Sequence, residues 1–396
     1  MNSRLKSKPK PRASAFSFSN ETLEVEIEKL SFGGDGIARK DGFVYFIPFS
    51  APGDHLKIQV TEKKKNFARG EILEILRRGP SRIEPFCPVF GRCGGCTWQH
   101  ITNAEQLNQK QRIVQEQLSR VVSEKTDILP IIPSPKYDHY RNRIQLKFDG
   151  KNLGFYARQS HDVVDVEDCP ITEKDVTQEI PDLRKKLKVH GKPVAKIEVL
   201  QTPNHKVETV FEDSPFEGVG FSQVNTGQNE KLIATVLDWM KGLSTTHIYD
   251  LYAGAGNFSF PLLEQFPKAS LVGVELNDKS VRIAQEQIRK KNLSPNRMQF
   301  YLADVELYLK RSLLAPGSLV LLDPPRAGCS ENTLRSLAQQ KIQRLFYISC
   351  NPAALARDLE HLKTWGNWVA RRVQPFDMFP QTDHVETLVE LVIDSP

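Results

Sequence analysis

The sequence predicts an α/β protein whose C-terminal half, residues 215–396, forms a doubly wound parallel sheet. Three observations lead to this fold class. From residue 215 onward, apolar runs of strand length alternate with helical patterns, which is typical of parallel sheets covered by helices. Short alternating segments with Gly and Pro turns fill residues 17–78 and indicate a small β-barrel. Between these regions, residues 79–214 join a cysteine-rich segment to a β-rich pattern, which predicts a central domain.

Length and composition describe an ordinary globular protein and exclude several classes. A chain of 396 residues, 39% apolar and 26% charged, suffices for two or three domains with their own cores. No run of about 18 apolar residues occurs, so we expect no membrane span and no membrane partner. The N-terminus lacks the apolar stretch of a signal peptide, and six cysteines are too few for a disulfide scaffold. We therefore expect a cytoplasmic protein, and no obligate protein partner is evident.

Basic charge is concentrated near the N-terminus. Residues 1–82 hold 16 Lys+Arg and 10 Asp+Glu, whereas residues 83–396 hold 38 of each. The whole formal excess of +6 therefore lies in the first fifth of the chain, which favours a polyanion such as RNA as the partner. Residues 1–16 are rich in Lys, Ser, Pro and Arg, and we expect a disordered basic arm there. A purely solubilising tail is the alternative.

The predicted barrel contains a basic run with one aromatic residue. Its expected strands cover residues 23–27, 43–47, 56–60 and 70–76, with a turn at Pro52-Gly53-Asp54. The run from Lys63 to Arg69 includes Phe67, and a ring among cations is typical of contacts with single-stranded RNA. A solvated hairpin tip is the alternative reading of this run.

The central region, residues 79–214, carries a cysteine cluster. Cys87, Cys93 and Cys96 are separated by five and two residues, and Cys169 lies far downstream. Three clustered thiolates and one remote thiolate give a four-sulfur set that suits zinc or an iron–sulfur cluster. The gap of five is not the spacing of enzymes that cleave S-adenosylmethionine by radical chemistry. A helix is expected over residues 103–122 and strands within 137–212. Cys329, the sixth cysteine, is left without a role.

The C-terminal region follows the strand–helix alternation of a doubly wound sheet. We expect strands at residues 247–251, 270–275, 298–302, 319–322, 345–348 and 387–393, and helices at residues 229–241 and 278–292. A further helix is expected after the glycine-rich turn that follows the first of these strands.

That turn predicts a nucleoside-containing cofactor. It reads Asp250-Leu-Tyr-Ala-Gly254-Ala-Gly256-Asn, and the two glycines allow the backbone a tight turn and a close approach to a ligand. Glu275 ends the next strand, 21 residues after Gly254, where a carboxylate accepts both ribose hydroxyls. Ser259 stands at the third glycine position of a dinucleotide fingerprint. The pattern therefore favours S-adenosylmethionine, which has no phosphate, over a dinucleotide.

Asp323 begins the segment Asp-Pro-Pro-Arg after another apolar strand. The two prolines predict a rigid turn at the carboxyl edge of the sheet, where open α/β sheets bind ligands. A carboxylate there can face the sulfonium of the cofactor or the imide edge of a base. The structural alternative is a helix N-cap followed by proline.

Cys350 ends a strand and precedes Asn-Pro, so we expect it at a helix N-terminus with a stabilised thiolate. A nucleophile has a clear use in methylation of uracil, because C5 becomes nucleophilic only after a thiolate adds to C6. A base must then remove the C5 proton so that the thiolate is eliminated. Asp383, His384 and Glu386 are the candidates, and chemistry alone does not choose among them.

Together these segments resemble the bacterial RNA 5-methyluridine methyltransferases that carry an N-terminal TRAM domain and an iron–sulfur cluster. The resemblance spans nearly everything after residue 16. It rests on the cysteine segment with Gln99-His100, on Tyr140-Arg141-Asn142, and on the segment from Ser160 to Cys169-Pro170. It rests also on residues 221–225, 250–252, 323–326, 349–352 and 383–386, and on the glycine segment 29–39.

The resemblance implies a Rossmann-like methyltransferase domain and a role for each motif. Cys350 is implied as the nucleophile and Glu386 as the proton acceptor. The implied ligands of a [4Fe-4S] cluster are Cys87, Cys93, Cys96 and Cys169. The implied S-adenosylmethionine-binding residues are Gln223, Tyr252, Asn257, Glu275, Asp304 and Asp323, with Tyr252 standing where some members carry Phe.

The TRAM domain and the four cysteines together favour the branch that acts on 23S ribosomal RNA, in a single-stranded or loop region, because the base must leave its stack. Three alternatives remain: a tRNA uridine methyltransferase of the same mechanism, a non-catalytic RNA-binding or assembly factor, and a cytosine C5-methyltransferase. The last is disfavoured, since such enzymes place a cysteine after a proline in the fourth-strand loop, where Pro324 is followed by Pro325.

Overall fold

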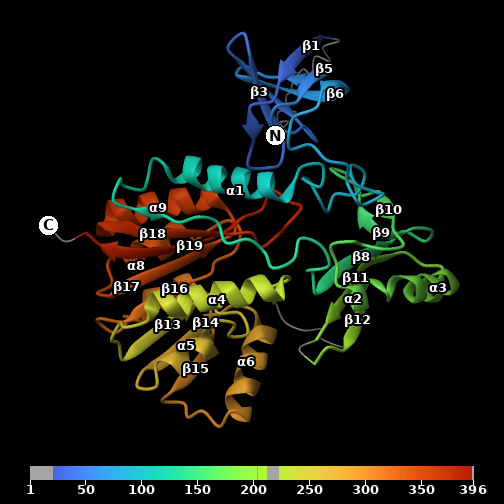
Figure 1. The fold of residues 1–396 in the computed structure, drawn as a ribbon. Helices are drawn as coiled ribbons and strands as arrows, with labels where there is room; N and C mark the ends of the chain where they lie inside the picture. Colours follow the sequence, from blue (N-terminus) through green and yellow to red (C-terminus); the bar gives the residue numbers. More distant parts are fainter. Residues whose placement is uncertain (1–20, 203, 212–222, 395–396) are drawn as a thin grey trace, which may run out of the picture. The chain divides into compact units, whose positions relative to one another are not determined.

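The structure, a computed structural model, describes residues 21–202, 204–211 and 223–394 and divides the chain into two compact units (Figure 1). The first unit is Met1–Arg82 and the second is Ile83–Pro396. The expected basic arm, residues 1–16, lies outside the described residues, as does the expected boundary near residue 215.

The first unit is a six-stranded sheet of order β1-β5-β6-β4-β3-β2. Its strands are β1 (Thr22–Glu26), β2 (Lys29–Leu30), β3 (Gly36–Lys40), β4 (Phe43–Ile47), β5 (His55–Lys63) and β6 (Phe67–Arg77). Alternating residues such as Leu56, Ile58 and Val60 point into one small apolar core, as the sequence pattern predicts. The basic run lies at the β5–β6 hairpin, where Lys63 lies over the ring of Phe43 and Lys64 over that of Phe67.

The second unit contains a five-stranded antiparallel sheet of order β10-β9-β8-β11-β12. Its strands are β8 (Arg143–Phe148), β9 (Leu153–Tyr156), β10 (Val163–Asp165), β11 (Val194–Gln201) and β12 (Val207–Phe211). Two helices that the sequence analysis did not predict, α2 (Lys174–Thr177) and α3 (Ile180–His190), lie between β10 and β11. Leu183 and Leu187 of α3 belong to the apolar core of this sheet.

An eight-stranded sheet of order β15-β14-β13-β16-β17-β19-β18-β7 forms the rest of the second unit. Its strands are β13 (His247–Leu251), β14 (Ser270–Glu275), β15 (Met298–Leu302), β16 (Leu319–Leu322), β17 (Arg344–Ser349), β18 (Trp368–Phe376), β19 (Glu386–Ile393) and β7 (Asp127–Ile128). The five strands from β15 to β17 are parallel, whereas β19 is antiparallel to both β17 and β18. The predicted doubly wound parallel sheet is thus confirmed for its first five strands and ends in an antiparallel pair.

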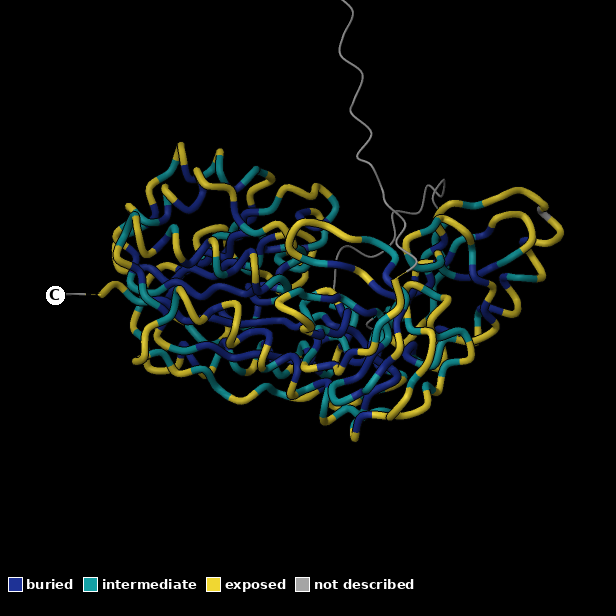
Figure 2. The backbone as a smooth tube through the Cα atoms, turned by 90° about the horizontal axis from the view of Figure 1, so that it is seen from above, coloured by how far each residue is buried: buried dark blue, intermediate teal, exposed yellow. Residues whose placement is uncertain are grey.

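Helices cover both faces of this sheet (Figure 1). One face carries α4 (Thr226–Met240), α5 (Ser259–Gln265) and α6 (Asp278–Lys290), and the other carries α1 (Asn103–Leu118), α7 (Val305–Arg311), α8 (Glu331–Ala338) and α9 (Pro352–Gly366). Residues of β17 alternate between the two cores: Tyr347 joins the α8–α9 side and Ile348 the α4–α5 side. The strands are the most deeply buried part of the unit (Figure 2).

The segment α1–β7 belongs to the large sheet although it precedes the five-stranded sheet in the chain. Helix α1 packs against α9 and β18, and β7 pairs with β18. Residues 103–128, which the sequence analysis assigns to the central domain, therefore cover the edge of the C-terminal sheet.

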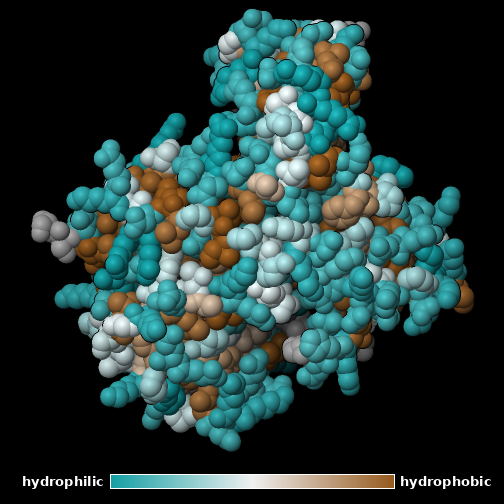
Figure 3. All heavy atoms as spheres, viewed as in Figure 1, coloured by the Kyte–Doolittle hydropathy of each residue, from teal (hydrophilic) through white to brown (hydrophobic). Residues whose placement is uncertain are grey.

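Hydrophilic residues dominate the face drawn in Figure 3, with hydrophobic residues in smaller areas between them. In the described part of the chain, none of the helices is long and apolar enough to cross a membrane.

Candidate active site

The candidate site lies at the carboxyl ends of β13, β16 and β17, where the strand order reverses. Chain order runs from β13 outward to β14 and β15, and then returns to β16 on the other side of β13. Open α/β sheets bind ligands at such a switch point. The turns after these three strands carry Tyr252, Asp323 and Cys350, and the start of the adjacent β19 carries Glu386.

The glycine-rich turn after β13 is held by Glu275 at the end of β14. The backbone N–H of Gly254 donates to Oε2 of Glu275 over 2.9 Å, and that of Asn277 donates to Oε1 over 2.7 Å. Gly254 and Gly256 have φ values of +55° and +91°, the left-handed region that glycine adopts at little cost. A Cβ added to Gly254 would meet no atom within 4 Å, so the turn faces open space.

Asp250 is buried beneath this turn and was not among the predicted site residues. The hydroxyl of Ser259 donates to its Oδ2, while Oδ1 is buried and has no hydrogen-bond partner in the structure. Burial raises the pKa of Asp250 to about 7, and the Glu275 carboxylate adds to the shift. The serine that replaces a fingerprint glycine thus serves to hold this carboxyl group.

Two of the predicted cofactor residues lie beside α4. The side-chain amides of Asn257 and Asn229 exchange two hydrogen bonds, of 2.9 and 3.0 Å, which join the glycine turn to the first turn of α4. Gln223 precedes α4, and its carbonyl oxygen accepts a hydrogen bond from the Asn142 amide. Asn229 carries no sequence signal of its own, because only its position on α4 brings it to Asn257.

Two other predicted cofactor residues use their side chains elsewhere. The hydroxyl of Tyr252 hydrogen-bonds with Cys329 and Thr333 on the α8 side of the sheet, and the backbone of Tyr252 has a φ of +66°. Asp304 caps α7, where its Oδ1 accepts the backbone N–H of Leu307 over 3.0 Å. Cys329, which had no assigned role, is buried against Tyr252 and Tyr347.

Asp323 lies at the centre of the acidic groups. Its backbone N–H donates to the carbonyl of Leu251, which joins the ends of β16 and β13. Burial, with smaller contributions from Asp250 and Glu275, raises the pKa of Asp323 to about 7. The alternative that Asp323 caps a helix is wrong, because α8 begins only at Glu331 and is capped by Ser330.

Cys350 follows β17 and is half-buried. Burial raises the pKa of its thiol to about 12, with smaller contributions in the same direction from Glu386 and Asp323. The expectation of a stabilised thiolate is therefore wrong for the protein alone. The physical reason is first the burial of the sulfur and then the two carboxyl groups near it, Glu386 and Asp323. The first free N–H groups of α9, from Ala353 and Ala354, are accepted by the Asn351 side chain.

Glu386 opens β19 with 3% of its surface exposed. Burial and the neighbouring Asp323 raise the pKa of Glu386 well above its usual range. Of the other two candidate bases, Asp383 accepts a hydrogen bond from the Thr97 hydroxyl, and burial lowers the pKa of His384. The structure thus brings Cys350, Glu386 and Asp323 within electrostatic reach of one another, and it engages Asp383 elsewhere.

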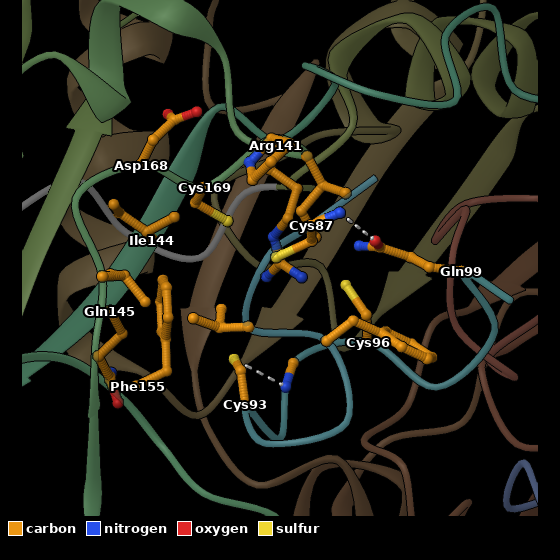
Figure 4. Close-up of a pocket in the computed structure, with 16 residues that line it drawn as sticks. Cys87, Cys93, Cys96, Gln99, Arg141, Ile144, Gln145, Phe155, Asp168 and Cys169 are labelled. Carbon is orange, nitrogen blue, oxygen red and sulfur yellow. Dashed lines mark hydrogen bonds between the residues drawn. The ribbon is translucent and has the colours of Figure 1, made fainter. Parts of the chain in front are cut away.

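The four remaining predicted residues lie around one cavity. The cavity has a volume of about 200 Å³, and Figure 4 shows the sulfur atoms of its four cysteines around a common space, with the Arg141 side chain beside them. These cysteines are Cys87, Cys93, Cys96 and Cys169. Burial raises the pKa of Cys96 to about 12 and also raises those of Cys93 and Cys169. Among the described residues, no group of three His, Cys, Asp or Glu side chains is arranged to hold a single metal ion.

Two family models match the chain. The model described as tRNA (Uracil-5-)-methyltransferase matches residues 211–393, which include the glycine turn, Asp323, Cys350 and Glu386. The model of the TRAM domain matches residues 17–73, which include most of the six-stranded sheet.

Whole-length relatives agree with these matches. An uncharacterized RNA methyltransferase of Bdellovibrio bacteriovorus is 43% identical over 380 residues, covering 94% of this chain and 95% of the relative. A 23S rRNA (uracil(1939)-C(5))-methyltransferase of Vibrio cholerae serotype O1 is 29% identical, covering 93% and 95%. The crystal structure of Pyrococcus abyssi tRNA (uracil-54, C5)-methyltransferase in complex with S-adenosyl-L-homocysteine is 23% identical, with a TM-score of 0.72, and covers 93% of this chain and 100% of that one. The two proteins therefore share a fold.

Proposed function

The chain belongs to the RNA (uracil-C5)-methyltransferases that carry a TRAM domain, and we propose that it methylates uridine C5 in 23S ribosomal RNA through a covalent intermediate on Cys350. S-adenosylmethionine is the proposed methyl donor. The observation that carries this proposal is the set of a cysteine and two buried carboxyl groups at the switch point, each influencing the pKa of the next. Uracil C5 chemistry needs a nucleophile and a base in that proximity.

The glycine turn suits S-adenosylmethionine as it stands. Open space lies beside Gly254, and both oxygens of Glu275 retain a lone pair for ribose hydroxyls after accepting one N–H each. The unpartnered Oδ1 of Asp250 offers a buried acceptor for a donor group of the ligand. When bound, the sulfonium supplies an electrophilic methyl group.

Cys350 acts as the nucleophile in the proposed reaction. The thiol proton leaves to solvent, and the thiolate adds to C6 of the uracil, so that C5 becomes an enolate carbon. C5 then attacks the methyl group, and the methyl–sulfur bond breaks to leave S-adenosylhomocysteine. At this stage C5 carries both the new methyl group and its original proton, and C6 is still bonded to Cys350.

Glu386 completes the reaction as the base. Its carboxylate takes the C5 proton, the C–H electron pair restores the C5–C6 double bond, and the C6–sulfur bond breaks to release the thiolate. Because burial and Asp323 raise the pKa of Glu386, its ionised form is a stronger base than an exposed glutamate. Asp323 is placed to face the sulfonium or the imide edge of the base.

Large-subunit ribosomal RNA is the substrate we favour. The relative from Vibrio cholerae that aligns over 93% of this chain is named for uracil 1939 of 23S rRNA. A tRNA substrate is the second candidate, because the matching family model and the Pyrococcus abyssi structure are both named for tRNA. The resemblance to the branch that carries both a TRAM domain and the four cysteines favours the ribosomal substrate.

Methylation assays on the two RNAs test the proposal. The cluster-loaded protein is incubated with labelled S-adenosylmethionine and unmodified 23S rRNA or tRNA, and 5-methyluridine is measured by nucleoside mass spectrometry. We expect 5-methyluridine in the rRNA, none with Cys350→Ala, and an accumulating covalent protein–RNA adduct with Glu386→Gln. Product in tRNA alone would replace the rRNA assignment, and cofactor binding without product in either RNA would contradict the proposed activity.

We also propose that the four cavity-lining cysteines hold a [4Fe-4S] cluster. The cavity of about 200 Å³ between the sulfurs suits a group larger than one ion, whereas zinc needs four sulfurs at about 2.3 Å from a single centre. Arg141 lines the same cavity and supplies a positive charge next to a cluster whose thiolate ligands carry negative charge.

Metal analysis tests this assignment. Anaerobically purified protein should contain about four iron and four sulfide per chain, the content of a [4Fe-4S] cluster. Cys169→Ala should lower both, whereas Cys329→Ala should leave both unchanged, because Cys329 lies outside the cavity. Zinc in equal amount to the chain, with no sulfide, would contradict the iron–sulfur assignment.

A further inference from the structure

The loop between β18 and β19, residues 377–385, is buried although it has no regular secondary structure along most of its length. Only Phe379 and His384 are half-buried, and the other residues of the loop are buried. A buried loop must find partners for its backbone groups, so its conformation depends on the elements that provide them. The loop ends directly at Glu386.

The cysteine segment provides several of these partners. The backbone N–H groups of Thr97 and Trp98 both donate to the carbonyl of Gln381 over 3.0 Å. The Thr97 hydroxyl accepts the backbone N–H of Asp383 and donates to its Oδ1, each over 3.1 Å. Thr97 follows Cys96 in the chain, so the residue after a cavity-lining cysteine holds the loop three residues before Glu386.

Helix α1 provides the rest of the frame. Gln106 is buried, and its amide accepts the N–H of Gln381 over 2.8 Å and donates to Oε1 of Gln381 over 2.9 Å. Lys110 is fully buried, donates to Asp377 and to the Phe379 carbonyl, and lies over the Trp98 ring. A buried lysine is tolerated only when it is paired, so this ion pair fixes α1 against the loop.

We propose that Thr97, Gln106 and Lys110 are positioning residues for loop 377–385, and that through this loop the cysteine segment sets the position of the Glu386 carboxylate. The side-chain hydrogen bonds of Thr97 and Gln106 reach the loop and not Glu386, so we expect their effect on the reaction to pass through the loop. The consequence for the reaction rests on the proposed function, because it concerns the step that Glu386 performs.

This arrangement gives the cysteine segment a place in the chemistry without any redox step. If the fold of the cysteine segment depends on the proposed cluster, the segment holds loop 377–385 in place only when the cluster is bound. Displacement of a catalytic group by about 1 Å costs roughly 100-fold in rate, so small shifts of the loop matter. Proton removal is the affected step, whereas addition of Cys350 to C6 depends on β17 and α9.

Hydrogen exchange and adduct kinetics test the proposal on the full-length, cluster-loaded protein. Thr97→Val keeps the side-chain shape and removes the hydroxyl, and Thr97→Ser restores the hydroxyl. Gln106→Met removes an amide on α1 that also donates to the carbonyls of Trp98 and Ile101. Thr364→Val serves as the matched control, because the Thr364 hydroxyl bonds only within α9. Iron and sulfide are measured for each variant, and Gln106→Met decides the outcome if Thr97→Val loses its cluster.

We expect amides of residues 377–386 to exchange about tenfold faster in Thr97→Val and Gln106→Met, and at the wild-type rate in Thr97→Ser and Thr364→Val. We expect breakdown of the covalent RNA adduct to slow at least about tenfold while its formation changes little. Unchanged exchange in both variants, or equal loss of formation and breakdown, would overturn the proposal. Exchange reports on the loop even if the wild-type protein methylates no RNA, an outcome that would count against the proposed function alone.

Discussion

At the scale of single residues, burial raises the pKa values of Cys350, Glu386 and Asp323. Burial and the two carboxyl groups raise the pKa of Cys350 to about 12. The thiolate fraction is therefore small at neutral pH. As long as the pH is below that pKa, the fraction increases about tenfold for each unit by which the pH rises. A nucleophile held as the thiol is protected against unproductive alkylation and oxidation until a substrate changes its surroundings.

This pKa predicts how the reactivity of Cys350 depends on pH. Alkylation by iodoacetamide in the absence of RNA should rise about tenfold per unit between roughly pH 7 and pH 9. In Glu386→Gln the rate at pH 9 should be higher than in the wild type, because one carboxylate that raises the pKa is gone. Mass spectrometry of the peptide that contains Cys350 gives the rate. A rate independent of pH above about 6 would show a stabilised thiolate and contradict the raised pKa.

The sequence could predict which candidate residues lie together at one edge of the sheet but not how they are supported. Cys350 and Asp323 each follow a recognisable strand and Glu275 ends one, so their common edge could be inferred from strand order alone. The partners of loop 377–385 could not, because Thr97, Gln106 and Lys110 precede their partners by 286, 275 and 267 residues. Contacts at such separation leave no local pattern in the sequence. For the same reason the raised pKa of Cys350 could not be predicted: its position before a helix is visible in the sequence, whereas the two carboxyl groups near its sulfur are not.

At the scale of elements, apolar runs gave the most reliable predictions. The strands expected at residues 247–251, 270–275, 298–302 and 319–322 are confirmed with the same bounds. Strand β18 was missed, because Arg371, Arg372 and Pro375 interrupt its apolar pattern. Arg372 is accommodated there by an ion pair of 2.6 Å with the buried Glu390 of β19. An ion pair between two neighbouring strands thus lets β18 form although its sequence lacks the regular alternation of apolar and polar residues that predicts a strand.

The glycine turn provides a prediction at this scale. Gly254→Ala should lower the free energy of unfolding by about 1–2 kcal/mol, the cost of a left-handed conformation for alanine. Gly256→Ala should cost about 2–4 kcal/mol, because its Cβ would also lie 2.6 Å from the buried ring of Phe260, which is stacked on Phe300.

Urea unfolding followed by tryptophan fluorescence measures both glycine variants against the wild type. The order of the two losses is the informative result, since both positions share the same turn. Equal losses would show that the Phe260 ring moves aside freely and that backbone conformation alone accounts for the requirement for glycine.

At the scale of the whole molecule, the sheet of the first unit presents cations and rings, and the second unit contains the residues of the proposed reaction. Lys65 is exposed at the β5–β6 hairpin tip beside the Lys64–Phe67 pair. If this hairpin binds the RNA backbone, Lys65→Ala should weaken RNA binding and reduce the slope of log affinity against log salt by about one.

Lys185→Ala is the matched control for that prediction, because Lys185 is exposed on α3 and paired with Asp182 at 3.0 Å. Its salt slope should equal that of the wild type. Filter binding at several salt concentrations gives both slopes, and identical slopes for Lys65→Ala and the wild type would remove the hairpin from the RNA-binding surface.

The most direct test of the whole account is to locate the covalent bond between protein and RNA. Glu386→Gln is incubated with S-adenosylmethionine and unmodified RNA, digested with nuclease and protease, and analysed by tandem mass spectrometry. We predict a peptide in which Cys350 carries a uridine nucleotide with one added methyl group. A nucleotide attached to any other residue, or methylated RNA released by this variant with no adduct at all, would contradict the central role of Cys350.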